Sequence, residues 1–131
     1  MLRIVIPARI GSSRLPDKMI QRIGGKMLVE HAIARVLDVA RPHQVWLASD
    51  SDIIAGAAIG KCNPVLTSAN CRSGTDRCAE VADLNDWDDD DIVLNVQADM
   101  PFLNPNHLLG FMRAAMRGGD WDVLTAFCDV R

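Results

Sequence analysis

Residues 3 to 18 read Arg-Ile-Val-Ile-Pro-Ala-Arg-Ile-Gly-Ser-Ser-Arg-Leu-Pro-Asp-Lys, and this stretch decides the fold class. It starts with Ile4-Val5-Ile6, a short apolar run that is typical of a buried parallel strand. Pro7 has no N–H to donate to a sheet ladder, so we expect the strand to end there. In open α/β sheets, ligands bind at the loops that follow the carboxyl ends of the strands. The sequence therefore predicts a strand followed directly by a binding loop.

The loop after this strand is basic and rich in small residues. It carries three cationic residues, which are Arg9, Arg14 and Lys18. Gly11 lets the backbone approach an anion closely, and the hydroxyls of Ser12 and Ser13 can donate hydrogen bonds. A solvated basic loop would have the same composition. Its place at the end of a strand favours a site for a polyphosphate.

Beyond this stretch, strand-like and helix-like patterns alternate along the chain. The predicted helices are 26–40, 53–59, 76–87 and one that opens at Asn104-Pro105 and closes at Gly118-Gly119. The further predicted strands are 45–48, 64–67, 92–96 and 121–127. This alternation predicts an α/β fold with a parallel sheet and helices on both faces. Right-handed crossovers would place the loops that follow the strands along one edge of that sheet.

The composition excludes several classes of function. With 131 residues and a net charge of −3, the chain is a single domain with no broad basic surface for nucleic acid. The four cysteines lack the C-x-x-C spacing of a zinc or redox motif, so we expect free thiols. No apolar run approaches the ~18–20 residues that cross a bilayer. We therefore expect a soluble cytoplasmic protein with neither a nucleic-acid nor a membrane partner.

A second polar segment, Ser73-Gly74-Thr75-Asp76-Arg77, stands at the start of a predicted helix and has the spacing of a capping box. Free backbone N–H groups and the positive end of the helix dipole suit an anion or a polar base edge there. In the alternative interpretation, the hydroxyls only cap the helix and Arg77 pairs with Asp76 or Glu80. The local sequence leaves both interpretations open.

A third segment, Asn95-Val96-Gln97-Ala98-Asp99, follows the strand predicted at 92–96. A carboxylate just past a central parallel strand, facing a basic phosphate loop, is a natural ligand for a magnesium ion shared with phosphates. A turn aspartate before Pro101 is the alternative. Taken together, the three segments predict one site with cations, anion-binding amides and a metal-binding carboxylate.

In this order, the segments resemble the CMP-3-deoxy-D-manno-octulosonate (CMP-Kdo) synthetases, the 3-deoxy-manno-octulosonate cytidylyltransferases. The first matching piece, Ile6-Pro-Ala-Arg-Ile-Gly-Ser-Ser-Arg-Leu-Pro16, is shared in outline with sugar nucleotidyltransferases generally. The second, Ser73-Gly-Thr-Asp-Arg77 followed by Ala79-Glu80-Val81, is more particular to the Kdo enzymes. The third is Asn95-Val-Gln97 with Asp99. The resemblance runs from about residue 3 to residue 105.

The resemblance implies a Rossmann-like sheet, the fold of the nucleotide-diphospho-sugar transferases. It implies that CTP and Kdo react to give CMP-Kdo and pyrophosphate, a step of lipopolysaccharide synthesis. Magnesium and cations would stabilise the departing pyrophosphate, so positioning and electrostatics would supply most of the catalysis. Family members run to nearly twice this length, so residues 1–131 are expected to form a single nucleotide-binding α/β domain, the first half of the family's catalytic domain.

The resemblance also implies roles for individual residues. Arg9, Lys18 and Asp99 are the expected catalytic residues, with Asp99 as the magnesium ligand. Arg77 and Gln97 are expected to contact the sugar. The expected nucleotide-binding residues are Ala8, Arg9, Gly11, Ser12, Ser13, Lys18, Ser73, Gly74 and Arg77.

The sequence departs from the family's usual pattern inside these motifs. The family typically has glycine where Asp17 and Ala98 stand, and histidine where Cys71 stands. The Asp17 charge beside Lys18 is expected to weaken the attraction for phosphate, and the Cβ of Ala98 to cost stability or narrow the site. The other departures replace two prolines and a glutamate, at Met19, Met27 and Met100.

Three functions are consistent with these observations. The first is a cytidylyltransferase for Kdo. The second is a catalytically inactive nucleotide-binding or interaction module, which the short length and the substitutions favour. The third is a cytidylyltransferase for another sugar acid such as a sialic acid, which explains residues 73–77 less well. An apolar strand left uncovered at 121–127 would invite pairing with another chain, so we also expect a homo-oligomer.

Overall fold

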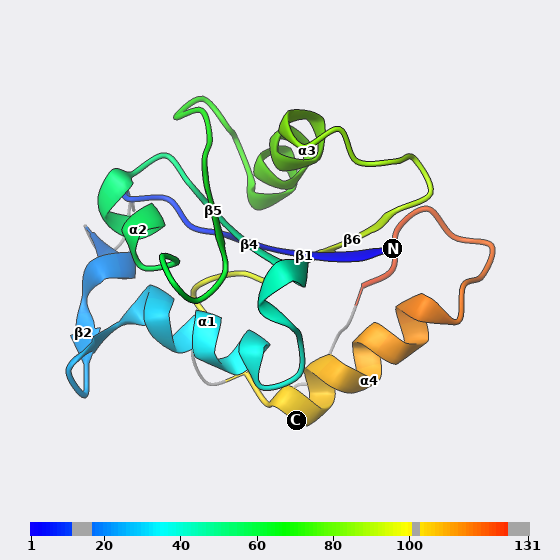
Figure 1. Ribbon diagram of the computed structural model, residues 1–131, viewed down its shortest axis with the longest axis horizontal. Coiled ribbons are helices and arrows are strands. Elements are labelled where there is room, and N and C mark those ends of the chain that lie inside the picture. The colour runs from blue at the N-terminus through cyan, green and yellow to red at the C-terminus, as the bar shows by residue number, and fades with distance from the viewer. Residues whose placement is uncertain (12–16, 101–102, 126–131) are drawn as a thin grey trace, which may run out of the picture.

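The structure, a computed structural model, describes residues 1–11, 17–100 and 103–125. Four parallel strands form its main sheet in the order β5-β4-β1-β6 (Figure 1). The predicted strands at 4–6, 45–48, 64–67 and 92–96 are all present with bounds shifted by one or two residues. The strands are β1 (Leu2–Pro7), β4 (Val45–Ser49), β5 (Asn63–Leu66) and β6 (Ile92–Asn95).

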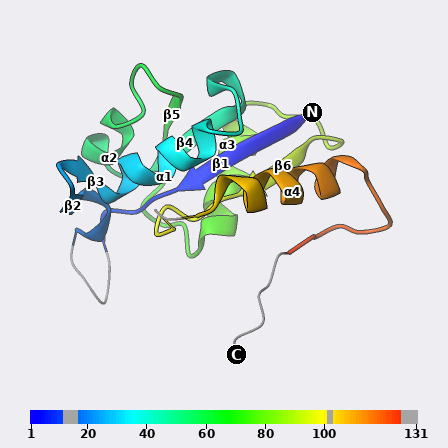
Figure 2. The ribbon, with the colours of Figure 1, turned by 90° about the horizontal axis from the view of Figure 1, so that it is seen from below.

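Helices cover both faces of this sheet, as the sequence predicts. Figure 2 shows α1 and α4 side by side on one face, with α3 on the other. The core residues of α2 pack on the face of α1. Among the described residues, no helix has both the length and the apolar character needed to span a bilayer. The helices are α1 (Leu28–Leu37), α2 (Asp52–Gly56), α3 (Gly74–Leu84) and α4 (Pro105–Met116).

The strand β1 lies at the centre of the fold, and its side chains are buried on both faces of the sheet. Ile4 and Ile6 are fully buried and pack with α1 and α4. Val5 points the other way and packs with Val81 of α3. A strand covered by helices on both faces reads as an unbroken apolar run, which is why the first stretch of sequence predicts it well.

The register of the sheet brings the carboxyl ends of the strands to one edge. β1 pairs in parallel with β4 and with β6. Beyond the strand, the N–H of Ala8 still donates to the carbonyl oxygen of Ala48 at 2.8 Å. The N–H of Thr67 donates to the carbonyl oxygen of Ser49, also at 2.8 Å. The segments after β1, β5 and β6 are thereby held close to one another.

The helix predicted at 26–40 is shorter than expected. Arg22–Ile23 (β2) and Lys26–Met27 (β3) form an antiparallel hairpin instead. Gly24 and Gly25 make its turn with φ angles of 61° and 84°, which glycine adopts without strain. The helix starts only at Leu28, where the Glu30 carboxylate accepts a hydrogen bond of 2.7 Å from the N–H of Met27.

The last predicted strand, 121–127, is wrong over residues 121–125, which are not in a strand. Positive φ at Gly118 (73°) ends α4, and Val123 is 84% exposed. Among the described strands, none pairs with β6 on its outer side, so β6 is an edge of the sheet. Strand propensity alone does not form a strand when the segment has no neighbour to bond to. Residues 126 and 127 lie outside the described residues.

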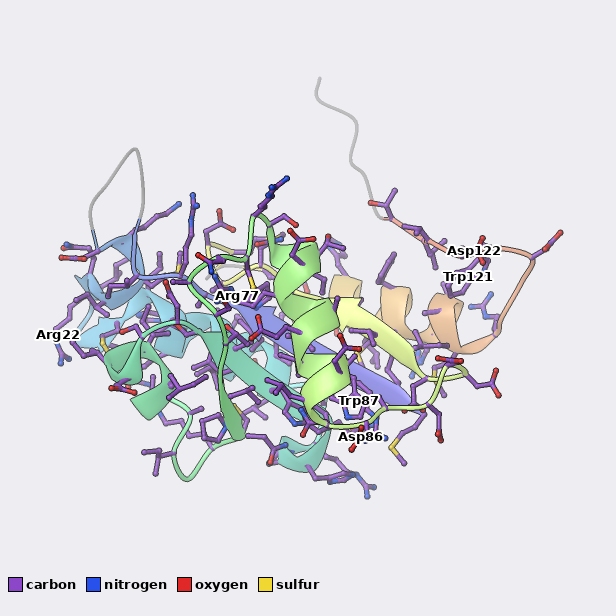
Figure 3. All side chains as sticks on the ribbon, turned by 90° about the horizontal axis from the view of Figure 1, so that it is seen from above. Arg22, Arg77, Asp86, Trp87, Trp121 and Asp122 are labelled. Atoms are coloured by element: carbon purple, nitrogen blue, oxygen red, sulfur yellow. The ribbon has the colours of Figure 1, made fainter. Side chains whose placement is uncertain are left out.

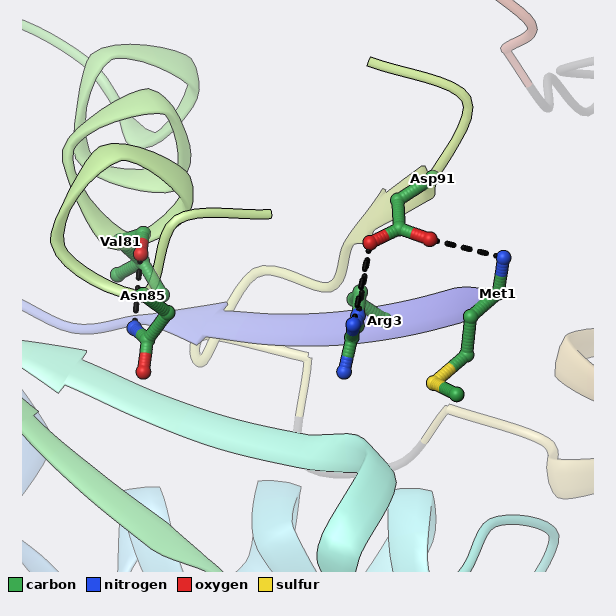
Figure 4. A network of polar contacts seen from close by, with 5 residues as sticks. All are labelled: Met1, Arg3, Val81, Asn85 and Asp91. Carbon is green, nitrogen blue, oxygen red and sulfur yellow. Dashed lines mark hydrogen bonds and ion pairs between the residues drawn. The ribbon is translucent and has the colours of Figure 1, made fainter. Parts of the chain in front are cut away.

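A polar network ties the start of β1 to the start of β6 (Figure 4). The Arg3 guanidinium donates from Nε and Nη2 to Asp91 Oδ2 at 3.2 and 3.1 Å, and the N-terminal ammonium of Met1 donates to Oδ1 at 2.9 Å. The Arg3 guanidinium also lies 5.6 Å from the ring centroid of Trp46 and 5.2 Å from that of Trp87. Asp91 is thus the shared acceptor of two cations.

We expect this network to make stability depend on pH. The N-terminal ammonium and the Arg3 guanidinium hold the pKa of Asp91 below its usual range, although desolvation opposes them. The ionised carboxylate therefore stabilises the fold at neutral pH, and this stabilisation is lost as pH falls from the usual value of about 3.9 through the lower folded-state pKa. Asp91→Asn should lower the urea midpoint at pH 7 and lower it by less at pH 2.5. Asp89→Asn, at an exposed neighbour, is the control; an equal loss at both pH values would contradict the prediction.

Candidate functional site

A pocket of about 250 Å³ opens at the carboxyl edge of the sheet, where the ends of β1 and β6 meet the start of α3. Figure 3 shows Arg77 on the first turns of α3, above the carboxyl end of β1. The pocket brings together seven residues that the sequence predicts for one site: Ala8, Arg9, Ser73, Gly74, Arg77, Gln97 and Asp99. Its remaining lining residues are Pro7, Met19, Cys71, Arg72 and Ala98.

The other predicted site residues that the structure describes do not line the pocket. Lys18 is connected to the pocket through Asp99, whose Oδ2 lies 3.7 Å from Lys18 Nζ. Gly11 is exposed and does not line the pocket. Ser12 and Ser13 lie outside the described residues.

The first wall of the pocket is the backbone that continues from β1. Ala8 is 3% exposed, whereas Arg9 is exposed at the pocket. The N–H of Ile10 donates to Asp50 Oδ1 at 3.2 Å, which fastens this segment to the end of β4. The strand therefore delivers a cation to the sheet edge, as the sequence predicts.

The second wall is the start of α3, which is capped as expected. Ser73 Oγ accepts a hydrogen bond of 3.1 Å from the N–H of Asp76. The return bond differs from a capping box, because Asp76 Oδ2 accepts from the N–H of Arg72 at 3.2 Å. The capped end of α3, with the positive end of the helix dipole, lines the pocket.

A side chain at Gly74 would be crowded by three neighbouring side chains, each of which would have to shift. A Cβ at this position would lie 2.7 Å from Gln97 Nε2 and 3.2 Å from Pro7 Cγ. It would also lie 3.3 Å from Asn95 Nδ2. Glycine is therefore what allows α3 to begin directly against the ends of β1 and β6. This contact also places the Gln97 amide beside the helix start.

Arg77 makes neither of the ion pairs considered from the sequence. It is 4% exposed, and among the described residues no carboxylate lies within ion-pair distance of it. Its Nη1 donates instead to Thr67 Oγ1 and, at 3.2 Å, to the carbonyl oxygen of Ser68. A buried cation without a counter-ion is costly unless a partner compensates it. The pocket wall therefore offers a positive charge to an anionic or polar group.

Cys71 lines the pocket as a hydrogen-bond donor. Its Sγ donates to Glu80 Oε2 at 3.0 Å, and Glu80 Oε1 accepts from the N–H of Ser68 at 2.9 Å. Desolvation and the bond to Glu80 raise the pKa of the Cys71 thiol, so the thiol is protonated at neutral pH. The sequence marks this residue only as a departure from the family pattern, and assigns it no role.

Asp99 is the carboxylate that fits a metal ion. Its side chain is 48% exposed and faces Lys18. In residues 1–11, 17–100 and 103–125, no three His, Cys, Asp or Glu side chains are grouped closely enough to hold a metal by themselves. Magnesium is commonly bound by one or two carboxylates together with substrate phosphates, and a single carboxylate at a cationic pocket suits that arrangement.

Ala98 and Asp17 both stand where the family typically has glycine, but they occupy different backbone conformations. Ala98 is 1% exposed and packs in the core cluster of the α1 face, without a positive φ. Its methyl group therefore fits the backbone and fills core space, so the structure gives no sign of the expected cost. Asp17 has a φ of 54°, in the left-handed region that favours glycine.

Comparisons with known proteins agree with this geometry. The sequence model of the cytidylyltransferase family matches residues 3–125. A 3-deoxy-manno-octulosonate cytidylyltransferase of Methylococcus capsulatus is 42% identical over 123 residues, which are 93% of this chain and 48% of that protein. The chain thus spans about half the length of the curated relatives it matches.

Two solved structures that match this chain are also cytidylyltransferases or CMP-sugar-acid synthetases by their names. A CMP:2-keto-3-deoxy-manno-octonic acid synthetase complexed with CTP matches with a TM-score of 0.77 and 36% identity, over 88% of this chain and 47% of that one. A cytidylyltransferase from Leptospira borgpetersenii matches with a TM-score of 0.71 over 91% of this chain and 50% of that one. Its 21% identity indicates the shared fold alone.

Proposed function

Since the chain belongs to the cytidylyltransferase family, we propose that it forms the CTP-binding part of an enzyme that transfers CMP from CTP to Kdo and releases pyrophosphate. The observation that carries this proposal is the pocket at the sheet edge, where Arg9, Arg77 and the start of α3 meet Asp99. The relative solved with CTP supports the choice of nucleotide.

The triphosphate would lie along the segment after β1. Arg9 and Lys18 would neutralise its charge, and Gly11, Ser12 and Ser13 would contribute backbone and hydroxyl donors. Magnesium held by Asp99 and the phosphates would supply further neutralisation of the departing pyrophosphate. Lys18 and Asp99 are close enough to act on the same phosphate group.

The other end of the pocket would hold the base and the sugar. Ala8, Ser73 and Gly74 would lie against the nucleotide, while Gln97 and Arg77 would contact the sugar acid. The anomeric hydroxyl of Kdo would attack the α-phosphorus in line, with pyrophosphate as the leaving group. The chain's own contribution is to orient the two reactants and to stabilise negative charge.

Calorimetric titration of CTP in the presence of magnesium tests this proposal, with ATP and UTP as nucleotide controls. We expect selective binding of CTP, weakened about tenfold by Arg9→Ala because a charged hydrogen bond is lost. Arg41→Ala is the matched control, since this exposed arginine precedes β4 at the opposite edge of the sheet. No binding of any nucleotide, or equal binding by both variants, would contradict the site.

A second candidate is a nucleotide-binding or interaction module without catalytic activity, which the departures from the family's usual residues inside the motifs favour. Pyrophosphate release from CTP separates the candidates. Release with Kdo supports the synthetase, release only with a sialic acid supports a cytidylyltransferase for that sugar acid, and CTP binding without release from either supports the module.

Asp17 should weaken nucleotide binding in this chain. It stands directly before Lys18 and is exposed, so its charge offsets part of the attraction for the triphosphate. Two unit charges ~4 Å apart interact by about 1 kcal/mol in water, which corresponds to about fivefold in affinity. Asp17→Asn should therefore tighten CTP binding by about two- to fivefold at low salt and less at high salt.

Asparagine keeps a residue type that tolerates the left-handed backbone at this position. Asp38→Asn, on an exposed aspartate after α1, is the control. A salt-independent gain, or no gain at all, would contradict the electrostatic explanation.

We also propose a cytoplasmic location, where CTP is available and thiols stay reduced, and self-association through β6. This strand is an edge of the sheet that the described residues form, and its Val93 is 38% exposed. The other edge, β5, contains Pro64, which cannot donate to a neighbouring strand. Sedimentation velocity should detect dimers at high concentration, and Val93→Lys should remove them. A monomer at all concentrations would contradict this prediction.

A further inference from the structure

We propose that Thr67 is a positioning residue, whose hydroxyl holds the Arg77 guanidinium at the pocket wall so that it meets the bound nucleotide or sugar acid. The identity of that ligand rests on the proposed function. The arrangement of the two side chains does not. Thr67 belongs to none of the motifs that predict the site, and it does not line the pocket itself.

Thr67 has a fixed place in the fold. It follows β5 directly and is 8% exposed. Its N–H donates to the carbonyl oxygen of Ser49 at 2.8 Å, which extends the pairing of β4 with β5 by one residue. The paired backbone fixes the position of Cβ, and the buried hydroxyl oxygen on it accepts a hydrogen bond from Arg77 Nη1. Thr67 therefore offers Arg77 an acceptor on a fixed backbone.

The other partner of this contact, Arg77, lies in the first turn of α3. Its Nη1 donates to Thr67 Oγ1 and to the Ser68 carbonyl oxygen. A free arginine side chain carries about 2 kcal/mol of rotamer entropy, part of which is lost when it binds a ligand. Holding the guanidinium in advance removes some of that cost from binding.

The chemistry of the acceptor matters as much as its place. A carboxylate bonded directly to Arg77 would also orient it, but it would neutralise the guanidinium charge. A hydroxyl and a backbone carbonyl are uncharged, so the two groups that hold Arg77 do not neutralise it. Glu80 holds the same loop by accepting from the N–H of Ser68, one residue beyond Thr67. The loop therefore stays attached to α3 when the threonine hydroxyl is removed, which makes the contact testable.

The test compares Thr67→Val, which removes the hydroxyl and keeps the shape, with Thr67→Ser, which keeps the hydroxyl. Ser49→Ala is the matched control, because it removes a fully buried hydroxyl on the neighbouring strand that bonds to Ser51 and not to Arg77. We expect Thr67→Val to weaken CTP binding about tenfold, and both other variants to bind like the parent protein.

A second readout does not depend on any nucleotide. The ¹⁵N side-chain resonances of Arg77, identified by their loss in Arg77→Lys, should be sharp and dispersed in the parent protein and in Thr67→Ser. In Thr67→Val they should move to the position of a solvated arginine. Unchanged Arg77 resonances in Thr67→Val overturn the proposal, as does a loss of the ordered signal in Thr67→Ser.

The two readouts separate this proposal from the proposed function. If the parent protein binds no CTP while the Arg77 resonances depend on the hydroxyl, the positioning role holds and the function fails. If Thr67→Val disturbs the resonances but binds CTP normally, or if Ser49→Ala weakens binding as strongly, the role in binding is overturned.

Discussion

Asp99→Asn is expected to change CTP binding in opposite directions with and without magnesium. With magnesium present, the variant should bind CTP at least about tenfold more weakly, because Asp99 is the carboxylate that would hold the ion beside the phosphates. Without magnesium, the same variant should bind CTP slightly more tightly than the parent protein. The Asp99 carboxylate then only repels the triphosphate, and it competes with the phosphates for Lys18, whose Nζ is 3.7 Å away.

Titrations with magnesium and with a chelator measure both effects. Asp122→Asn is the control, because this exposed aspartate follows α4 and lies far from Arg77 in Figure 3. An equal loss with and without magnesium would mean that Asp99 contacts the nucleotide or supports the loop rather than the metal. No change under either condition would remove Asp99 from the site.

Ile6→Ala is expected to cost about 2–5 kcal/mol of folding free energy, as large-to-small changes in a core do. Ile6 is fully buried in the cluster that joins β1 to α1 and α4, and its strand partner is Leu47. A loss of this size is a large part of the ~5–15 kcal/mol that stabilises an ordinary domain. The thermal midpoint should fall by about 10 °C or more.

Denaturant and thermal unfolding check this result. Ile6→Val removes one methyl group and should cost only about 0.5–1.5 kcal/mol. Ile59→Ala, at a side chain that is 73% exposed, should stay within about 0.5 kcal/mol of the parent protein. A midpoint for Ile6→Ala equal to that of Ile59→Ala would show that the β1 core is not tightly packed.

The sequence predicts the parallel sheet well because β1 and β4 are apolar on both faces. A short, continuous apolar run of this kind is typical of a strand buried between two layers of helices. The sequence fails where a local pattern depends on a partner. The apolar residues at 121–125 have no neighbouring strand among the described ones, and Lys26-Met27 pairs with Arg22-Ile23 in a short hairpin although its composition suits a helix. Pairing of this kind is decided by tertiary contacts, which propensity does not report.

The pocket follows the same rule. Arg9, Ser73 and Asp99 could be predicted because each follows or precedes a regular element at the same edge of the sheet. The contact between Thr67 and Arg77 could not, since it joins residues ten apart across a loop and has no motif. For Arg77 the sequence suggested acidic partners close in the chain, but the helix points its guanidinium toward uncharged oxygens.

The pocket residues and the core residues are largely separate sets, and this separation has an evolutionary consequence. Arg9, Ser73, Gln97 and Asp99 are exposed and lie outside the apolar clusters that stabilise the sheet. Apart from the helix cap that Ser73 supplies, mutations at these positions would be nearly neutral for folding, so a gene copy released from selection for catalysis could lose its ligand chemistry and still encode a stable domain. Arg77 and Ala8 are exceptions, because both are buried and line the pocket, so they should be among the last site residues to drift.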